Sequence, residues 1–261
     1  MGAYLTFVAA APLASFGDVA PGERRGSAGR PTRSGLLGLV AAALGLERDD
    51  RAALAALTEG YGLACALLPG ATPLLDYHTV QTPRGTDLNR FAKGTGRRPA
   101  TRAEELAAGR PDTLLSRRDY WCDVVVLAAL WVRPGAPHEL PALAQALRRP
   151  RFALYLGRKS CPLMLPLDPR VVEAPDAVAA IGAIRPADAL WPFADKAGGW
   201  TRPAQEVSLD PDDPAARVDG ARETQRRDLS RHHPGWFFEP RREVTVPLPV
   251  PSGAGTGAPA P

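Results

Sequence analysis

The order of the predicted elements indicates an α+β fold, and three features of the sequence support this prediction. Strand-like and helical segments follow one another as strand–helix–strand, twice over, which is the split βαβ pattern of the ferredoxin-like fold. The 31-residue stretch Gln81–Pro111 lacks apolar periodicity and is rich in Arg, Gly and Pro. Strand signals return within Trp236–Pro247 and indicate a pair of strands. We therefore predict a βαββαβ core with a long basic insertion and a small, mostly β C-terminal region.

The first half of the core comes from residues 3–80, where apolar runs of strand length flank a helical stretch with a polar start. A Pro-Gly turn signal at 69–73 separates the last two strands. The predicted elements are a strand at Ala3–Ala9, a Gly-, Pro- and Arg-rich loop at Pro12–Arg33, a helix at Ser34–Leu46, its continuation or a second helix at Asp49–Thr58, and strands at Tyr61–Leu68 and Leu74–Val80.

The second half begins after the basic insertion, where β-prone residues return. The predicted elements are strands at Thr113–Tyr120 and Asp123–Val132, a helix at Glu139–Leu147, a strand at Phe152–Leu156 and a later helix at Asp176–Ile184. We accordingly expect a ferredoxin-like domain over residues 1–165, a small β-rich region over 166–248, and a disordered Pro-, Gly- and Ala-rich tail over 249–261.

The composition is that of a soluble globular protein, with 45% hydrophobic and 23% charged residues. The longest apolar run is shorter than the ~18 residues that a membrane span requires. Cys65, Cys122 and Cys161 are odd in number and far apart, which argues against a disulfide framework and a structural zinc site. We expect a cytoplasmic protein that holds no metal and no cofactor.

Positive charge is concentrated in three segments, although the net charge of the whole chain is only +4. Arg24–Arg33 carries a net charge of +4, and Arg84–Arg102 and Arg148–Lys159 carry +5 each, which leaves −10 for the remainder. Such segregation is typical of a protein that binds a polyanion. Because 29 of the 32 basic residues are Arg, these clusters could also be ordinary solvated surface.

The loop before the first helix is a candidate phosphate site. Its glycines let the backbone approach a ligand, and Arg24, Arg25, Arg30 and Arg33 supply positive charge. Thr32 or Ser34 can cap the helix, whose free N–H groups favour an anion. The alternative is a flexible loop followed by a capped helix.

Tyr77 and His78 lie at the start of the basic insertion, and Arg117 and Arg118 lie at its end. His78 could act as a general base in metal-independent RNA cleavage, with Tyr77 and a nearby Arg assisting. A His beside an Asp is more often a hydrogen-bonded structural residue. The sequence contains no serine-hydrolase elbow, zinc-protease motif or Cys-x-x-Cys pair.

Five segments together resemble a known family in order and spacing. They are Pro12–Gly17, Pro31–Gly45, Asp76–Gln81, Leu114–Tyr120 and Leu154–Pro162. In these segments the chain resembles the CasD-type subunits of type I-E CRISPR Cascade complexes, which belong to the RAMP superfamily. The resemblance covers about residues 3–167, and only Arg227–Asp228 and Trp236–Val246 extend it, loosely, into the last third.

The resemblance implies an RRM-like (RAMP) version of the ferredoxin-like fold, in which a thumb, here about residues 81–112, kinks a bound RNA. It implies a non-catalytic subunit that binds the 5′ handle of CRISPR RNA (crRNA) and contacts the backbone subunit and the large PAM-recognising subunit of Cascade. No membrane and no small-molecule substrate are implied. A related subtype uses its equivalent subunit as an endoribonuclease, so repeat-RNA cleavage by His78 and Tyr77 stays the alternative.

The predicted RNA contacts combine the resemblance with the charge pattern. They are Arg24, Arg25, Arg30, Arg33, Ser34, Tyr77, His78, Gln81, Arg84, Arg90, Lys93, Arg97, Arg98, Arg117, Arg118, Arg158, Lys159 and Ser160.

Overall fold

The computed structural model describes residues 1–17, 22–184, 204–230 and 238–248. The chain forms two compact units. The first, which we call the body, comprises residues 1–17, 28–72 and 121–261. The second, which we call the arm, comprises residues 18–27 and 73–120. The expected tail at 249–261, and Trp236 in the expected C-terminal strands, lie outside the described residues.

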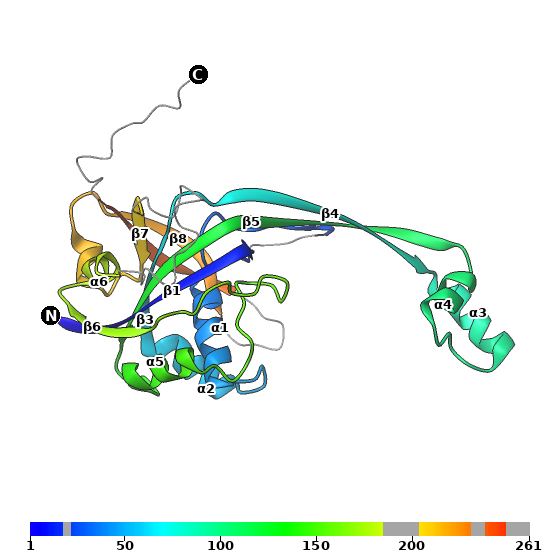
Figure 1. Cartoon of the computed structure of the whole chain (residues 1–261), viewed down its shortest axis with the longest axis horizontal. Coiled ribbons are helices and arrows are strands. Elements are labelled where there is room, and N and C mark those ends of the chain that lie inside the picture. The colour runs from blue at the N-terminus through cyan, green and yellow to red at the C-terminus, as the bar shows by residue number, and fades with distance from the viewer. Residues whose placement is uncertain (18–21, 185–203, 231–237, 249–261) are drawn as a thin grey trace, which may run out of the picture. The chain divides into compact units, whose positions relative to one another are not determined.

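The body is built on one antiparallel sheet with the strand order β6-β1-β5-β3-β7-β9-β8 (Figure 1). Its central pair places Leu5 of β1 opposite Leu130 of β5. The strands are β1 (Gly2–Ala14), β3 (Tyr61–Leu67), β5 (Pro111–Val132, of which residues 121–132 belong to the body), β6 (Arg170–Ala174), β7 (Glu206–Leu209), β8 (Arg222–Ser230) and β9 (Phe238–Pro247).

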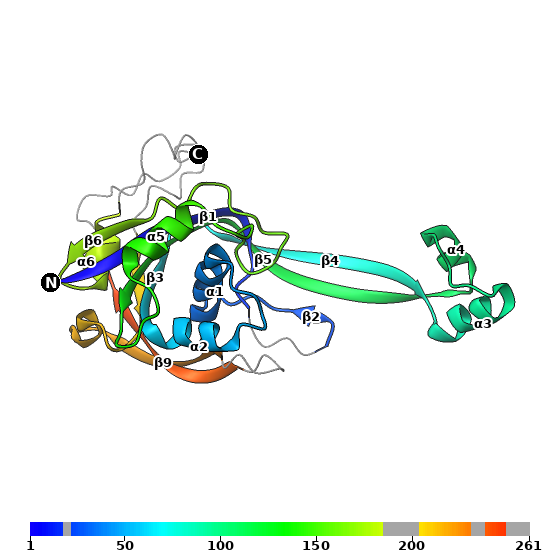
Figure 2. The same ribbon diagram turned by 90° about the horizontal axis from the view of Figure 1, so that it is seen from below.

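Helices cover both faces of this sheet, because β1 buries alternate side chains on each face. Leu5 and Phe7 belong to one apolar cluster, and Tyr4 and Val8 belong to the other. Helices α1 (Arg33–Leu44), α2 (Arg51–Gly60) and α5 (Leu140–Arg148) pack against the first cluster, and α6 (Ala177–Gly182) packs against the second (Figure 2). A 3-10 helix, Pro214–Arg217, follows β7.

Helix α1 has clear signals at both ends. Thr32 accepts a hydrogen bond from the Gly35 N–H, as an N-cap side chain does. The helix stops at Gly45, whose φ of 82° suits glycine and whose N–H donates hydrogen bonds to the carbonyls of Ala41 and Ala42 in the last turn. The sequence-predicted helix at Ser34–Leu46 is therefore confirmed to within two residues at each end.

The arm is a long two-stranded ribbon that carries two short helices (Figure 1). Strand β4 (Thr72–Pro83) pairs with β5, and the short β2 (Arg24–Arg25) pairs in parallel with β5. Between β4 and β5 lie α3 (Gly85–Thr95) and α4 (Arg102–Ala107). No residue of α3 or α4 is fully buried, but Leu88, Phe91 and Ala92 follow helical spacing on α3 and are partly buried, so the expected lack of apolar periodicity in this stretch is wrong.

Three sequence-based assignments of strands are wrong. The strand pair expected within Trp236–Pro247 is one strand, β9, over the described residues 238–247. The strand expected at Phe152–Leu156 is absent, because the N–H groups of Arg151 and Phe152 bond to carbonyls at the end of α1 instead of to a strand. The edge strand beside β1 is Arg170–Ala174. The two strands expected around residue 121 form one strand, β5, in which Asp123 has a φ of 55°.

The strands after residue 165 extend the same sheet, since β7 pairs with β3 and β9 pairs with β7. The compact units therefore divide near residues 73 and 120, and not near residue 165. Within the described ranges, no helix is long and apolar enough to cross a membrane.

Candidate nucleic-acid interface

The predicted RNA contacts are distributed over both units. The arm holds Arg24, Arg25, Tyr77, His78, Gln81, Arg84, Arg90, Lys93, Arg97, Arg98, Arg117 and Arg118, and the body holds Arg30, Arg33, Ser34, Arg158, Lys159 and Ser160.

Four arginines from two distant segments meet on the ribbon of the arm. Arg24 pairs with Arg117, and Arg25 pairs with Arg118, in the parallel β2–β5 ladder. Because neighbouring residues of a strand point to opposite faces, each face of the ribbon carries one Arg from each strand. We call Arg24, Arg25, Arg117 and Arg118 the arginine ladder.

Strand β4 adds an exposed aromatic ring to the arginine ladder. The guanidinium carbon of Arg117 lies 5.7 Å from the centre of the Tyr77 ring, within the range of a cation–π contact. Tyr77 is 54% exposed, so its ring is available to a partner. Arg24 is balanced by Asp119, at 2.8 Å. Three segments that are distant in the sequence thus meet here.

His78 lies on the opposite face of β4 from Tyr77, as consecutive strand residues must. Its Nδ1 is 2.6 Å from the Asp76 carboxylate, and its side chain is 60% exposed. The Tyr77 hydroxyl and the His78 imidazole therefore do not converge on one point. The two side chains therefore do not form the His–Tyr pair that the alternative function, RNA cleavage, would use.

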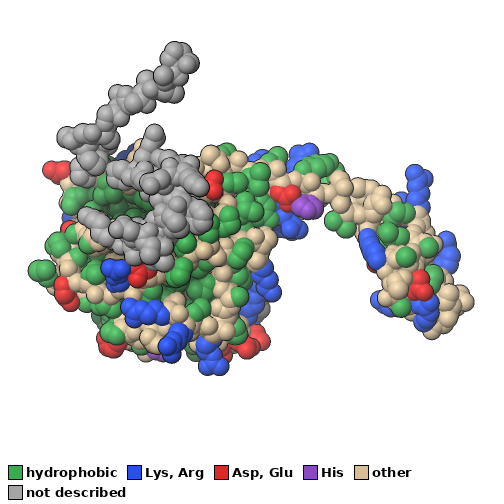
Figure 3. All heavy atoms as spheres, viewed as in Figure 1, with side chains coloured by type: hydrophobic (Ala, Val, Ile, Leu, Met, Phe, Trp, Pro, Cys, Tyr) green, Lys and Arg blue, Asp and Glu red, His purple; other side chains and the backbone are tan. Residues whose placement is uncertain are grey.

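The helices of the arm carry many cations, several of which are ion-paired (Figure 3). Arg84 pairs with Asp112, Arg90 with Asp87, and Arg97 with Glu104. Hydrogen bonds from Arg97 and from the backbone N–H of Ala100 lower the pKa of Glu104 to about 2. Over residues 22–27 and 73–120, eleven Lys and Arg side chains face seven Asp and Glu, so the described arm keeps a net charge of +4.

The remaining arm residues of the predicted set are exposed. Lys93 and Arg98 form no ion pair with the described residues, and both are accessible. The Gln81 side chain is exposed, and its backbone carbonyl accepts a hydrogen bond from Arg102.

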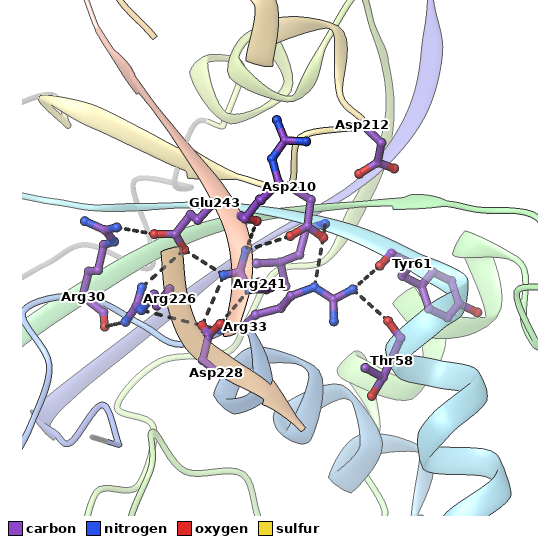
Figure 4. Close-up of polar contacts among 12 residues, drawn as sticks. Arg30, Arg33, Thr58, Tyr61, Asp210, Asp212, Arg226, Asp228, Arg241 and Glu243 are labelled. Carbon is purple, nitrogen blue, oxygen red and sulfur yellow. Dashed lines mark hydrogen bonds and ion pairs between the residues drawn. The ribbon is translucent and has the colours of Figure 1, made fainter. Parts of the chain in front are cut away.

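In the body, Arg33 is buried in an ion-pair cluster, with only 3% of its side chain exposed (Figure 4). Its Nε donates to Asp210 at 2.9 Å, and its terminal nitrogen donates to the carbonyls of Thr58 and Tyr61. The Asp210 carboxylate also accepts hydrogen bonds from Arg133 and Arg241. A guanidinium held this way has no exposed surface to offer a phosphate, which corrects the sequence-based expectation.

The same cluster engages Arg30. This guanidinium pairs with Glu243 of β9, and the Arg30 carbonyl accepts a hydrogen bond from Arg226 of β8 at 2.8 Å. Arg241 bridges Asp228 and Glu243. Burial works to lower the pKa of Arg241, but the hydrogen bond and charge of Asp228 outweigh it and raise that pKa. Carboxylates from the C-terminal strands thus neutralise the second half of the predicted phosphate loop.

The N-terminus of α1 is also occupied. Asp228 accepts a hydrogen bond from the Arg33 N–H at 2.8 Å, while Thr32 accepts one from Gly35. A carboxylate at a helix N-terminus takes the place that a phosphate would use. The expected phosphate seat at this helix is therefore filled from within the protein.

The Arg158–Ser160 segment forms a turn against the end of β1. The Ser15 N–H donates to Leu156, and Gly157 has a φ of 88°. Lys159 and Ser34 line one groove of about 860 Å³ that runs along α1. Arg33 also lines this groove, but its side chain is held in the buried ion-pair cluster.

The cluster residues Asp210, Asp228, Arg241 and Glu243 were not predicted as site residues, although Asp228 and the segment that holds Arg241 and Glu243 belong to the loose C-terminal resemblance. The signal that marks them is alternation, because Arg226 and Asp228, and likewise Arg241 and Glu243, are two residues apart and face the same side of a strand. Within the described ranges, no group of three or more His, Cys, Asp or Glu is arranged to hold a metal ion.

The fold and the surface together define a mixed α/β protein with one large antiparallel sheet and a basic two-stranded arm. The family model described as CRISPR-associated protein (Cas_Cas5) matches residues 4–246. The chain is 34% identical over 184 residues to the CRISPR system Cascade subunit CasD of Escherichia coli (strain K12), covering 67% of this chain and 74% of the relative. The chain belongs to the Cas5 family of CRISPR-associated proteins.

Two solved structures share the fold. A chain of a CRISPR RNA-guided surveillance complex superposes with a TM-score of 0.59 at 22% identity, covering 95% of this chain and 91% of that chain. A crystal structure of a Cas protein gives a TM-score of 0.52 at 22% identity, covering 95% of both chains.

Proposed function

We propose that this protein is a non-catalytic RNA-binding and assembly subunit of a cytoplasmic CRISPR surveillance complex, where it binds the 5′ handle of crRNA. The observation that carries the proposal is the arginine ladder beside Tyr77. Arg guanidinium groups grip phosphates bidentately, and an exposed aromatic ring stacks on unpaired bases. Single-stranded RNA offers both groups at once.

The topology supports the finer fold assignment that the family suggests. The strand order β6-β1-β5-β3, with helices between β1 and β3 and between β5 and β6, is the order of a ferredoxin-like βαββαβ core. In this proposal the arm is the thumb that kinks the RNA. The backbone subunit and the large PAM-recognising subunit of the complex are the proposed protein partners.

The buried cluster changes which residues we assign to RNA. We retain the ladder, Tyr77 and the exposed cations of the arm, and we leave Arg33 out because its guanidinium is buried and bonds to Asp210 and to the Thr58 and Tyr61 carbonyls. Lys159 and Ser34 stay in the proposed set as residues of one accessible groove.

The first experiment is to isolate the protein from its native cytoplasm and to sequence the RNA that accompanies it. We expect RNAs that share one repeat-derived 5′ end, together with other protein subunits. Recovery without RNA, or with RNA that has no common end, would contradict handle binding.

A salt titration then tests the arginine ladder itself. Each phosphate contact with single-stranded RNA contributes ~0.7 to the slope of log affinity against log salt. Replacing Arg24, Arg25, Arg117 and Arg118 with Ala should therefore flatten that slope by up to ~0.7 per lost contact. Arg242→Ala, on an exposed ion pair of the body, is the matched control and should leave the slope unchanged.

The alternative function, metal-independent cleavage of repeat RNA, rests on the exposed His78 beside Asp76. It requires His78→Ala to abolish cleavage in the presence of EDTA. We expect that neither the protein nor the His78→Ala variant cleaves the RNA, because Tyr77 lies on the opposite face of β4 from His78.

A further inference from the structure

Strand β4 forms one edge of the ribbon of the arm (Figure 1). Among the described residues, β4 pairs only with β5, and β2 adds a third strand only beside Arg117 and Arg118. Away from those two positions the described ribbon has two strands, and an isolated two-stranded hairpin is marginally stable in water. The outer edge of β4 therefore presents backbone N–H and C=O groups that no described strand pairs.

The side chains along this edge are apolar and exposed. Leu74 is 43% exposed, Leu75 is 58% exposed and Val80 is 49% exposed, in addition to Tyr77. Strand β4 contains one acidic residue, Asp76, and no Lys or Arg. Exposed apolar side chains that lie together mark an interaction site, whereas scattered ones do not.

The edge strand of the body, β8, has the opposite character. Its exposed residues include the charged Arg222, Glu223 and Arg227, and none of its exposed residues is apolar. Charged side chains of this kind protect a sheet edge from the addition of another strand. Strand β4 lacks such protection until Gln81, whose carbonyl accepts a hydrogen bond from Arg102. The unprotected edge of the arm thus spans residues 73–80.

From this arrangement we infer that the outer edge of β4 pairs with an extended segment of another protein subunit, which adds a third strand to the ribbon. The edge offers main-chain donors and acceptors, and an extended polypeptide matches them along its whole length. A nucleic acid offers phosphates and bases, which cannot continue the ladder of a sheet. The inference rests on the proposed function, in which the protein assembles with other subunits, and it specifies how one of them contacts the arm.

The chemistry of the edge defines the added strand. Its side chains beside Leu74, Leu75 and Val80 should be aliphatic or aromatic, because apolar cross-strand pairs stabilise a sheet. Acidic residues should flank them, since the described arm has a net charge of +4. The strand adds in the plane of the ribbon, so both faces, with the arginine ladder and Tyr77, stay accessible to RNA.

Hydrogen exchange tests the inference because it measures the backbone N–H groups themselves. Three samples are compared: the free full-length protein, the protein with a short RNA that carries the recovered 5′ end, and the isolated complex. Residues 74–80 have seven N–H groups, of which about three to four point to the outer edge of the strand. In the complex, this segment should take up about three to four fewer deuterons than in the other two samples.

Variants of the edge connect this protection to strand addition. Val80→Lys places a charge on the edge and should remove the extra protection in the complex. Thr224→Lys places the same charge on an exposed residue of β8, and this matched control should behave as the wild type. Val80→Ile retains a β-branched apolar side chain and should also behave as the wild type. None of the three removes a positive charge, so RNA affinity should not fall.

Several outcomes would overturn the inference while leaving RNA binding intact. They are no extra protection in the wild-type complex, equal protection by RNA alone, and unchanged protection in a folded Val80→Lys complex. Protection that appears in the free protein and is lost on dilution would assign the edge to a second copy of this chain.

Failure of the proposed function gives a different result. A complex that holds other protein subunits but no RNA would contradict handle binding, and protection of residues 74–80 in that complex would still support strand addition. Recovery of the chain alone would overturn both proposals.

Discussion

Replacing Arg33 with Met should destabilise the protein without removing an RNA contact. The guanidinium makes hydrogen bonds of 2.9 Å to Asp210, 2.8 Å to the Thr58 carbonyl and 2.6 Å to the Tyr61 carbonyl. Thr58 lies in the last turn of α2, where carbonyls lack partners within the helix. Arg33 thus caps α2 and also neutralises Asp210.

The expected magnitude follows from burial. Removing one partner of a buried ion pair costs ~3–5 kcal/mol, a large part of the ~5–15 kcal/mol by which domains are stable. With an m-value of ~3 kcal/mol/M, the urea midpoint should fall by about 1 M or more. Circular dichroism and tryptophan fluorescence should report the same shift.

The matched control is Arg24→Met, on the arm. Its side chain is 69% exposed and pairs with Asp119, and exposed pairs contribute little to stability. This variant should unfold at the wild-type midpoint but bind RNA more weakly. The reasoning is refuted if Arg33→Met keeps the wild-type midpoint and weakens RNA binding, because Arg33 would then be a surface contact.

Three further predictions test local structure. Gly157→Ala should lower the unfolding free energy by at least ~1–3 kcal/mol, because the new Cβ would lie 1.7 Å from the Ser15 carbonyl oxygen at a φ of 88°; thermal unfolding measures this. At pH 8 a thiol reagent should modify the half-buried Cys122 quickly and Cys65, with its pKa near 12, slowly. NMR titration should show Glu104 ionised down to about pH 2, and Arg97→Ala should raise that midpoint.

Each of these has a control. Gly38→Ala, in the interior of α1 with open space around it, should be neutral or stabilising by up to ~1 kcal/mol. Rapid labelling of Cys65 in the folded protein would contradict its burial. Because the pKa of Glu104 is lowered in the folded protein, its ionised carboxylate stabilises the folded contacts at pH values above the unfolded-state pKa, and this stabilisation is lost as the pH falls towards about 2. A titration midpoint near 4.5 would contradict the ion pair with Arg97.

Most of the core could be predicted from the sequence because its elements are locally encoded. Tyr61–Leu67 and the end of β5 are apolar runs that pair with each other, and α1 has a Thr cap and a terminal Gly. The helices α3 and α4 were not predicted because they are short and fully bury no residue, and the apolar stripe of α3 consists of just Leu88, Phe91 and Ala92 in a stretch rich in Arg, Gly and Pro. At Phe152–Leu156 the residue types suited a strand, but the backbone found its partners on α1.

The roles of the arginines could not be predicted in the same way, because their partners are distant in the sequence. Asp210 is 177 positions from Arg33, and Glu243 is 213 positions from Arg30. A count of charge along the chain gives Arg30 and Arg33 the same weight as Arg24 and Arg25. Only the fold distinguishes an Arg held by a buried carboxylate from one on an exposed ribbon.

This distinction explains what the C-terminal strands contribute. Strands β8 and β9 supply Asp228 and Glu243, which bond to the Arg33 N–H at the start of α1 and to the Arg30 guanidinium just before it. A polyanion could recruit these arginines only by displacing buried carboxylates, which would then be left without partners at a cost larger than one phosphate contact returns. The acids of β8 and β9 therefore hold the end of this loop in place, and in the proposed function the exposed arginines of the arm contact the RNA.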